Sequence, residues 1–75
     1  MILENLLKKT RKEKRITQVK LAQKSYVSIR AYQNYEAGKR VPDVYAAQRM
    51  AKGLGVKVEY LFPLHDVQEE PDKAV

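Results

Sequence analysis

Closely spaced helix start and stop signals constrain this chain more than any other feature. Thr17 and Ser28 are good N-cap residues, because a hydroxyl oxygen accepts a hydrogen bond from a free amide in the first turn of a helix. Gly38 and Gly55 are suited to helix ends, because glycine adopts the left-handed backbone of a C-terminal cap without steric cost. A chain of 75 residues punctuated in this way must fold as several short helices.

Apolar residues recur at helical spacing between these signals, and they predict an all-α fold of five helices. The first helix is expected over Leu3–Lys14, the second from Gln18 to near Ser25, and the third from Ile29 to Ala37. A fourth opens at Pro42 and Asp43 and ends at Gly55, and a short fifth covers Val58 to Phe62.

Charge is distributed unevenly along the chain, whose net charge is +6. Residues 1–57 hold 14 Lys and Arg against four Asp and Glu, whereas residues 58–75 hold one lysine against five acidic residues. The sequence thus predicts a basic domain over residues 1–62 and an acidic, flexible tail over residues 63–75, dispensable for folding. A basic body attracts polyanions, of which nucleic acid and anionic membrane are the two candidates.

Several classes of protein fit the sequence poorly. Cysteine is absent, so neither disulfides nor thiolate metal sites are expected, and the chain suits a reducing compartment. The apolar start followed by basic residues reverses the order of a secretory signal. The first helix is the one candidate for a helix that lies on a membrane surface, but its apolar face is needed for the core. His65 is the only histidine, and it falls in the tail without a glycine-rich phosphate loop near it. We therefore expect a cytoplasmic protein that is not an enzyme, with no membrane contact, cofactor or metal.

The second and third predicted helices, joined by about three residues, have the spacing of a helix-turn-helix, whose second helix enters the major groove. Tyr32 and Tyr35 lie on one side of that helix and are expected in the core, which disfavours an RNA-stacking role for them. By the helical period, the opposite arc faces DNA and holds the candidate base-reading residues Ser28, Ile29, Arg30, Gln33 and Asn34.

Four of these side chains suit a particular base. The guanidinium of Arg30 suits guanine, Gln33 or Asn34 can bond adenine through two hydrogen bonds, and Ile29 suits a thymine methyl group. A phosphate contact is the alternative role for Arg30. Gln18, at the positive end of the second helix, is expected to donate to a phosphate.

Seventeen residues of defined type also resemble the lambda-repressor and Cro-like (Xre) family of DNA-binding domains over about residues 3–62. They are Arg11, Thr17, Gln18, Leu21, Ala22, Val27, Ser28, Tyr35 to Lys39, Pro42, Ala51, Leu54, Leu61 and Phe62. The resemblance implies a five-helix fold, double-stranded operator DNA as ligand, a role in transcription regulation, most often repression, and a homodimer.

The resemblance also implies particular roles. Arg11 and Glu36 would form an internal salt bridge, and Lys39 and Arg40 would contact the DNA backbone. Tyr26 departs from the family, which commonly has glycine at this turn because glycine adopts a left-handed backbone without cost, so the turn is expected to be either strained or slightly reshaped.

The segment after Gly55 is the expected dimer surface. Leu61 is expected to face the core, and the apolar area would come from Tyr60, Phe62 and Leu64. The alternative function is that of an antitoxin or partner-binding module, which would engage another protein through the C-terminal segment.

Overall fold

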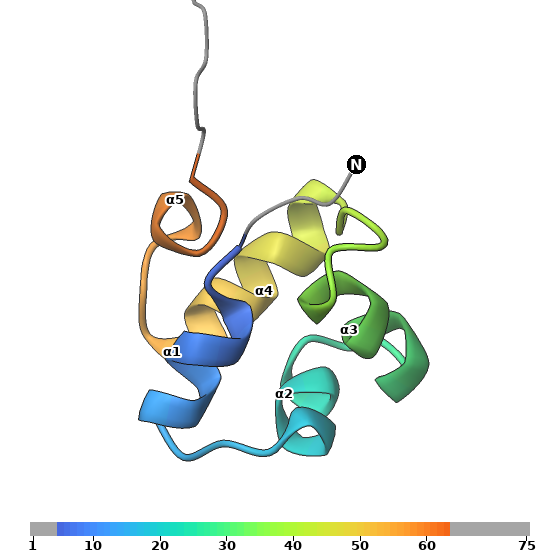
Figure 1. Cartoon of the computed structure of the whole chain (residues 1–75), viewed down its shortest axis with the longest axis horizontal. Coiled ribbons are helices and arrows are strands. Elements are labelled where there is room, and N and C mark those ends of the chain that lie inside the picture. The colour runs from blue at the N-terminus through green and yellow to red at the C-terminus, as the bar shows by residue number, and fades with distance from the viewer. Residues whose placement is uncertain (1–4, 64–75) are drawn as a thin grey trace, which may run out of the picture.

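The computed structural model describes residues 5–63, which form an all-α arrangement of short helices (Figure 1). Helix α1 spans Leu7–Glu13, α2 Gln18–Lys24, α3 Ile29–Glu36, α4 Val44–Leu54 and α5 Val58–Leu61. Helix α2 packs against α3 and α4, and α4 packs against α5. The predicted all-α fold of five helices is confirmed. The predicted tail lies outside the described residues except for Pro63.

Side-chain caps explain where the three central helices begin. The Thr17 hydroxyl accepts a hydrogen bond from the Lys20 amide at 3.0 Å, and the Ser28 hydroxyl accepts one from the Ala31 amide at 3.0 Å. Asp43 caps α4 in the same way, with its carboxylate 2.8 Å from the amide of Ala46. Each cap satisfies an amide that has no partner inside its helix, so local chemistry sets these boundaries.

Helix α1 begins later than the sequence predicted, at Leu7 rather than Leu3. Asn5 and Leu6 lie outside the helix, where one local and one long-range hydrogen bond hold them. The Asn5 side-chain oxygen accepts from the Leu7 amide at 3.0 Å, while the Leu6 amide donates to the Leu61 carbonyl at 2.9 Å. The Leu6 amide thus bonds to α5, whereas the apolar spacing predicted that Leu6 would be part of the first helix. Leu3 lies outside the described residues.

The core receives side chains from all five helices. Its principal members are Leu7, Leu21, Tyr32, Tyr35, Met50, Leu54 and Leu61. The two tyrosines of α3 and Leu61 are buried, as predicted. Because the tyrosines fix one side of α3 against the core, the opposite arc of that helix lies at the surface.

The turn between α2 and α3 keeps a left-handed backbone at Tyr26, whose φ is +56°, so of the two alternatives the structure has the strained turn. The Tyr26 ring stays in solvent, 81% exposed, and the Arg49 guanidinium lies 5.5 Å from its centroid. The Nε of Arg49 also donates to the carbonyl oxygen of Ser25 at 2.8 Å, at the end of α2. Arg49 therefore ties α4 to the turn that sets the angle between α2 and α3.

Candidate nucleic-acid interface

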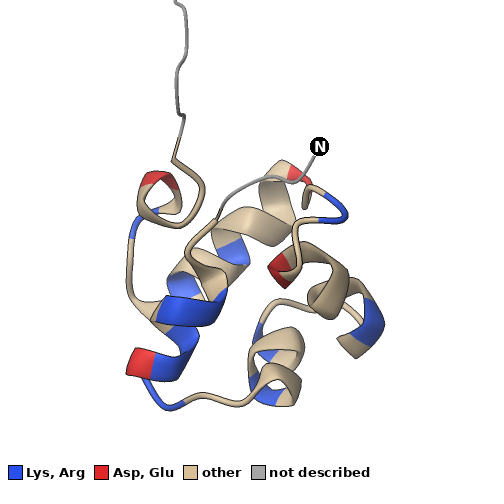
Figure 2. Cartoon of the chain, viewed as in Figure 1, with Lys and Arg blue, Asp and Glu red and all other residues tan. Residues whose placement is uncertain are grey.

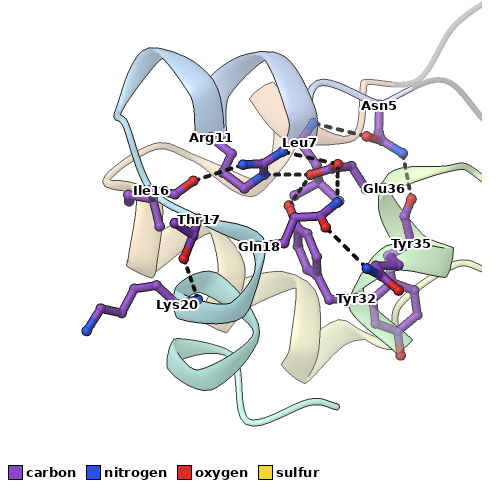
Figure 3. Close-up of polar contacts among 11 residues, drawn as sticks. Asn5, Leu7, Arg11, Ile16, Thr17, Gln18, Lys20, Tyr32, Tyr35 and Glu36 are labelled. Carbon is purple, nitrogen blue, oxygen red and sulfur yellow. Dashed lines mark hydrogen bonds and ion pairs between the residues drawn. The ribbon is translucent and has the colours of Figure 1, made fainter. Parts of the chain in front are cut away.

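A carboxylate at the end of α3 joins α1, α2 and α3 (Figure 3). One oxygen of Glu36 lies 2.8 Å from Arg11 Nε and 2.7 Å from the Tyr32 hydroxyl. The other accepts from the Gln18 side-chain amide at 2.9 Å and from Arg11 Nη2 at 3.4 Å. Only 11% of the Arg11 side chain and 7% of the Glu36 side chain are exposed, so this pair is largely shielded from water.

The protonation states in this cluster follow from its contacts. Burial raises the pKa of Glu36, but hydrogen bonds from Arg11, Tyr32 and Gln18 and the charge of Arg11 outweigh burial and leave that pKa below its ordinary 4.5. Burial, and then the hydrogen bond to Glu36, raise the pKa of Tyr32 above its ordinary 10.0. The carboxylate is therefore ionised at neutral pH, and the tyrosine remains a donor.

We expect the stability of the protein to fall with pH on the acid side of the ordinary value of 4.5 for Glu36. The unfolded carboxyl binds a proton first, so the stabilisation is complete above that value and is lost as the pH falls through the lower pKa of the folded state. Urea titrations from about pH 6 to about pH 3 measure this slope. Glu36→Gln should flatten it, and equal slopes in the two proteins would contradict the assignment.

The predicted base-reading residues share the surface arc of α3. Four of them are exposed, and Asn34 is half-buried. The helix begins after the Ser28 cap, so Ile29 and Arg30 lie in its first turn, and both are exposed. Ile29 is 38% exposed, which leaves an apolar side chain available beside the guanidinium and amide groups.

The loop after α3 turns back on the helix and leaves two cationic side chains at the surface. The amides of Lys39 and Arg40 donate to the carbonyl oxygen of Asn34, at 2.9 and 3.3 Å. Both side chains are exposed, and the Arg40 guanidinium lies 5.9 Å from the centroid of the Tyr35 ring. Because these amides are engaged inside the protein, a phosphate at this loop would be bound by the side chains.

Gln18 has a different environment from the free surface donor that the sequence suggested. It is half-buried, and both ends of its amide have protein partners. Nε2 donates to Glu36, and Oε1 accepts from Gln33 Nε2 at 3.3 Å. The sequence analysis missed this link, as it missed the Tyr32 hydroxyl, although the i, i+4 spacing of Tyr32 and Glu36 on one helix is a usable signal.

Lys and Arg outnumber Asp and Glu over the described residues; four of these cations lie on α1, whereas α3 holds one arginine and one glutamate (Figure 2). Residues 5–63 include 14 Lys and Arg, and their four acidic residues are Glu13, Glu36, Asp43 and Glu59. In the same part of the chain, His, Asp and Glu form no group of three or more that could hold a metal ion. None of the helices between residues 5 and 63 has the length and apolar character needed to span a membrane.

Known proteins share this arrangement. Residues 7–61, which contain all five helices, match the family described as Helix-turn-helix. The chain belongs to the helix-turn-helix family. Its branch is the lambda-repressor and Cro-like (Xre) type, which confirms the resemblance noted in the sequence. This is a family of transcription regulators, in agreement with the expectation that the chain is not an enzyme.

This helix-turn-helix chain is 41% identical over 61 residues to the uncharacterized HTH-type transcriptional regulator YqaE of Bacillus subtilis (strain 168). The match covers 81% of this chain and 52% of YqaE, so the chain spans about half the length of that relative. Among solved structures, it resembles the restriction-modification controller protein C.AhdI from Aeromonas hydrophila, with 25% identity and a TM-score of 0.70 over 75% of this chain and 85% of the other. It also resembles the biofilm master regulator SinR in complex with DNA, with 26% identity and a TM-score of 0.65 over 71% and 86% of the two chains.

Proposed function

We propose that this helix-turn-helix protein is a sequence-specific transcription regulator that binds double-stranded DNA and acts as a repressor by occupying its operator. The observation that carries the proposal is the surface arc of α3, which presents amide, guanidinium and apolar groups on a basic body. Such groups discriminate base edges in the major groove, while the surrounding cations attract the phosphates. The relation to SinR, which was solved in complex with DNA, supports this proposal.

In the proposed complex, Ser28, Ile29, Arg30, Gln33 and Asn34 face the bases, and Lys39 and Arg40 bind backbone phosphates. Gln18 retains one amide hydrogen with which it can reach a phosphate as well, because an NH2 group has two hydrogens and Glu36 takes one of them. The hydrogen bonds around Glu36 fix α3 to α1 and α2, so the surface arc of α3 is already ordered before DNA binds.

A homodimer is part of the proposal, because one short reading helix makes few base contacts and two of them can bind half-sites about 34 Å apart. Tyr60 on α5 is 43% exposed and offers apolar area for such a contact. Phe62 offers less than the sequence suggested, since it is half-buried and packs against the core. Leu64 lies outside the described residues.

Selection of bound duplexes from a random library tests the function and its symmetry together. We expect an enriched consensus made of two inverted half-sites, and sedimentation on that consensus should give two chains per duplex at saturation. A library without enrichment would reject sequence-specific binding and favour the partner-binding alternative. A single half-site with one bound chain would reject the homodimer alone.

A further inference from the structure

A basic hollow lies between α2 and α4, away from the residues that are proposed to contact DNA. It measures about 600 Å³ and is lined by Lys24, Tyr26, Arg49, Lys52 and Gly53. Three of these five residues are cationic, and none of the five is acidic. Lys24 ends α2, whereas the proposed phosphate contact of that helix is at its start, and α3, which the structure describes in full, contributes no residue to the lining. Base reading therefore does not account for the positive charge gathered here.

Arg49 is fixed in this hollow at two points. Its Nε donates to the carbonyl oxygen of Ser25 at 2.8 Å, and its guanidinium lies 5.5 Å from the centroid of the Tyr26 ring. Within residues 5–63, its terminal nitrogens Nη1 and Nη2 take part in no hydrogen bond or ion pair. These two nitrogens form a planar fork that matches two oxygens of one anion, and a fork that is already ordered loses less entropy on binding. Arg49 thus presents a preorganised anion-binding group.

Gly53 leaves room for a ligand between the two helices. A Cβ at this position would lie 3.2 Å from Leu21 Cδ1 and 3.4 Å from two carbons of the Lys24 side chain, so a larger residue would occupy the hollow and displace that lysine. Lys24 and Lys52 are both exposed, and their flexible stems can bring two ammonium groups to a ligand that is bound at Arg49.

We propose that this hollow binds a small molecule that carries a diphosphate group, with one phosphate on the Arg49 fork and the other between Lys24 and Lys52. A single carboxylate would leave two of the three cations without a partner, whereas a diphosphate brings about three negative charges and oxygens for every donor. The volume of the hollow is in the range of about 300–1,000 Å³ that is usual for small-molecule sites. The site is separate from the proposed function, because α3 takes no part in it.

Titration with inorganic pyrophosphate tests the site without DNA. At constant ionic strength, pyrophosphate should raise the melting temperature until the site is saturated, because a ligand that binds only the folded chain stabilises it. Orthophosphate should bind more weakly, since one phosphate cannot reach the Arg49 fork and both lysines together. Isothermal titration calorimetry gives the Kd for each anion.

Three variants locate the site. Arg49→Lys keeps the charge and can still donate to Ser25 but has no fork, so we expect the Kd for pyrophosphate to rise about 10-fold. Lys52→Gln should raise it about 2- to 5-fold. Because Lys52 is exposed, this variant tests the site even if Arg49→Lys is poorly folded. Lys57→Gln, which removes an exposed lysine outside the hollow, is the matched control and should leave the Kd nearly unchanged.

Two results would overturn the inference. The first is that pyrophosphate does not bind, or binds wild type, Arg49→Lys and Lys52→Gln with one Kd, which is the behaviour of diffuse attraction to a basic surface. The second concerns DNA as the other source of phosphate. We expect Arg49→Lys and Lys52→Gln to leave the slope of log K against log salt on a duplex unchanged; a reduced slope in both would mean that the hollow contacts the DNA backbone and not a small molecule.

Discussion

Glu36→Ala is expected to lower the free energy of unfolding by about 3 kcal/mol, the cost typical of breaking a largely buried ion pair. The loss is large because Arg11 keeps its charge in a shielded position, where 11% of its side chain is exposed. The Tyr32 hydroxyl and the Gln18 amide lose their acceptor at the same time. A small domain is stable by only about 5–15 kcal/mol, so this variant should melt far below the wild type.

The exposed pair Lys9–Glu13 provides the matched control for this measurement. Its two charged atoms are 2.8 Å apart, as in the Arg11–Glu36 pair, but more than half of each side chain is exposed. Glu13→Ala should therefore change the urea midpoint much less than Glu36→Ala. Equal midpoints for the two variants would mean that the cluster around Glu36 contributes no more than a surface pair.

Arg30→Ala should weaken binding to the preferred duplex by about 1–3 kcal/mol, which is about 5- to 150-fold in Kd. Arg30 is exposed in the first turn of α3, where it can reach guanine O6 and N7 through two hydrogen bonds. A base contact of this kind carries sequence information, so the preference at one guanine should relax as well. Affinity for a scrambled duplex should fall much less.

Arg40→Ala is the control for Arg30→Ala, because Arg40 is expected to contact a phosphate and not a base. A phosphate contact releases counterions, so Arg40→Ala should weaken binding to both duplexes alike and reduce the slope of log K against log salt by nearly one unit. Lys39→Ala should behave in the same way. Titrations of the preferred and scrambled duplexes at several salt concentrations measure both quantities. If Arg30→Ala weakens the two duplexes equally, Arg30 is a backbone contact.

The helix boundaries that depend on neighbouring residues could be predicted from the sequence. Ser28 and Asp43 bond amides three residues ahead, so the information for the start of α3 and α4 is local. The burial of Tyr32 and Tyr35 followed from the helical period in the same way. Once the third helix was known, its surface arc and hence the candidate reading residues followed without any knowledge of distant contacts.

Contacts between distant residues could not be predicted in this way. The start of α1 depends on Leu6 meeting Leu61, and the Asn5 side chain donates to the carbonyl of Tyr35 at 3.0 Å across 30 positions of sequence. No periodicity specifies such pairs. The partners of Gln18 belong to the same class, because its amide direction is set by a carboxylate 18 residues away. The sequence therefore predicted which side chains share the surface arc of α3 but not how the protein holds them.

The left-handed backbone at Tyr26 affects which residues can occupy this turn without loss of stability. A side chain in that backbone region costs about 1–2 kcal/mol, and glycine would relieve it. The same change would lose the Arg49 stack, worth about 0.5–1 kcal/mol, and would add about 0.5–1 kcal/mol of backbone entropy to the unfolded chain. These contributions nearly cancel, so tyrosine and glycine are close to interchangeable for folding. Selection on stability alone would hardly distinguish the two residues at this turn.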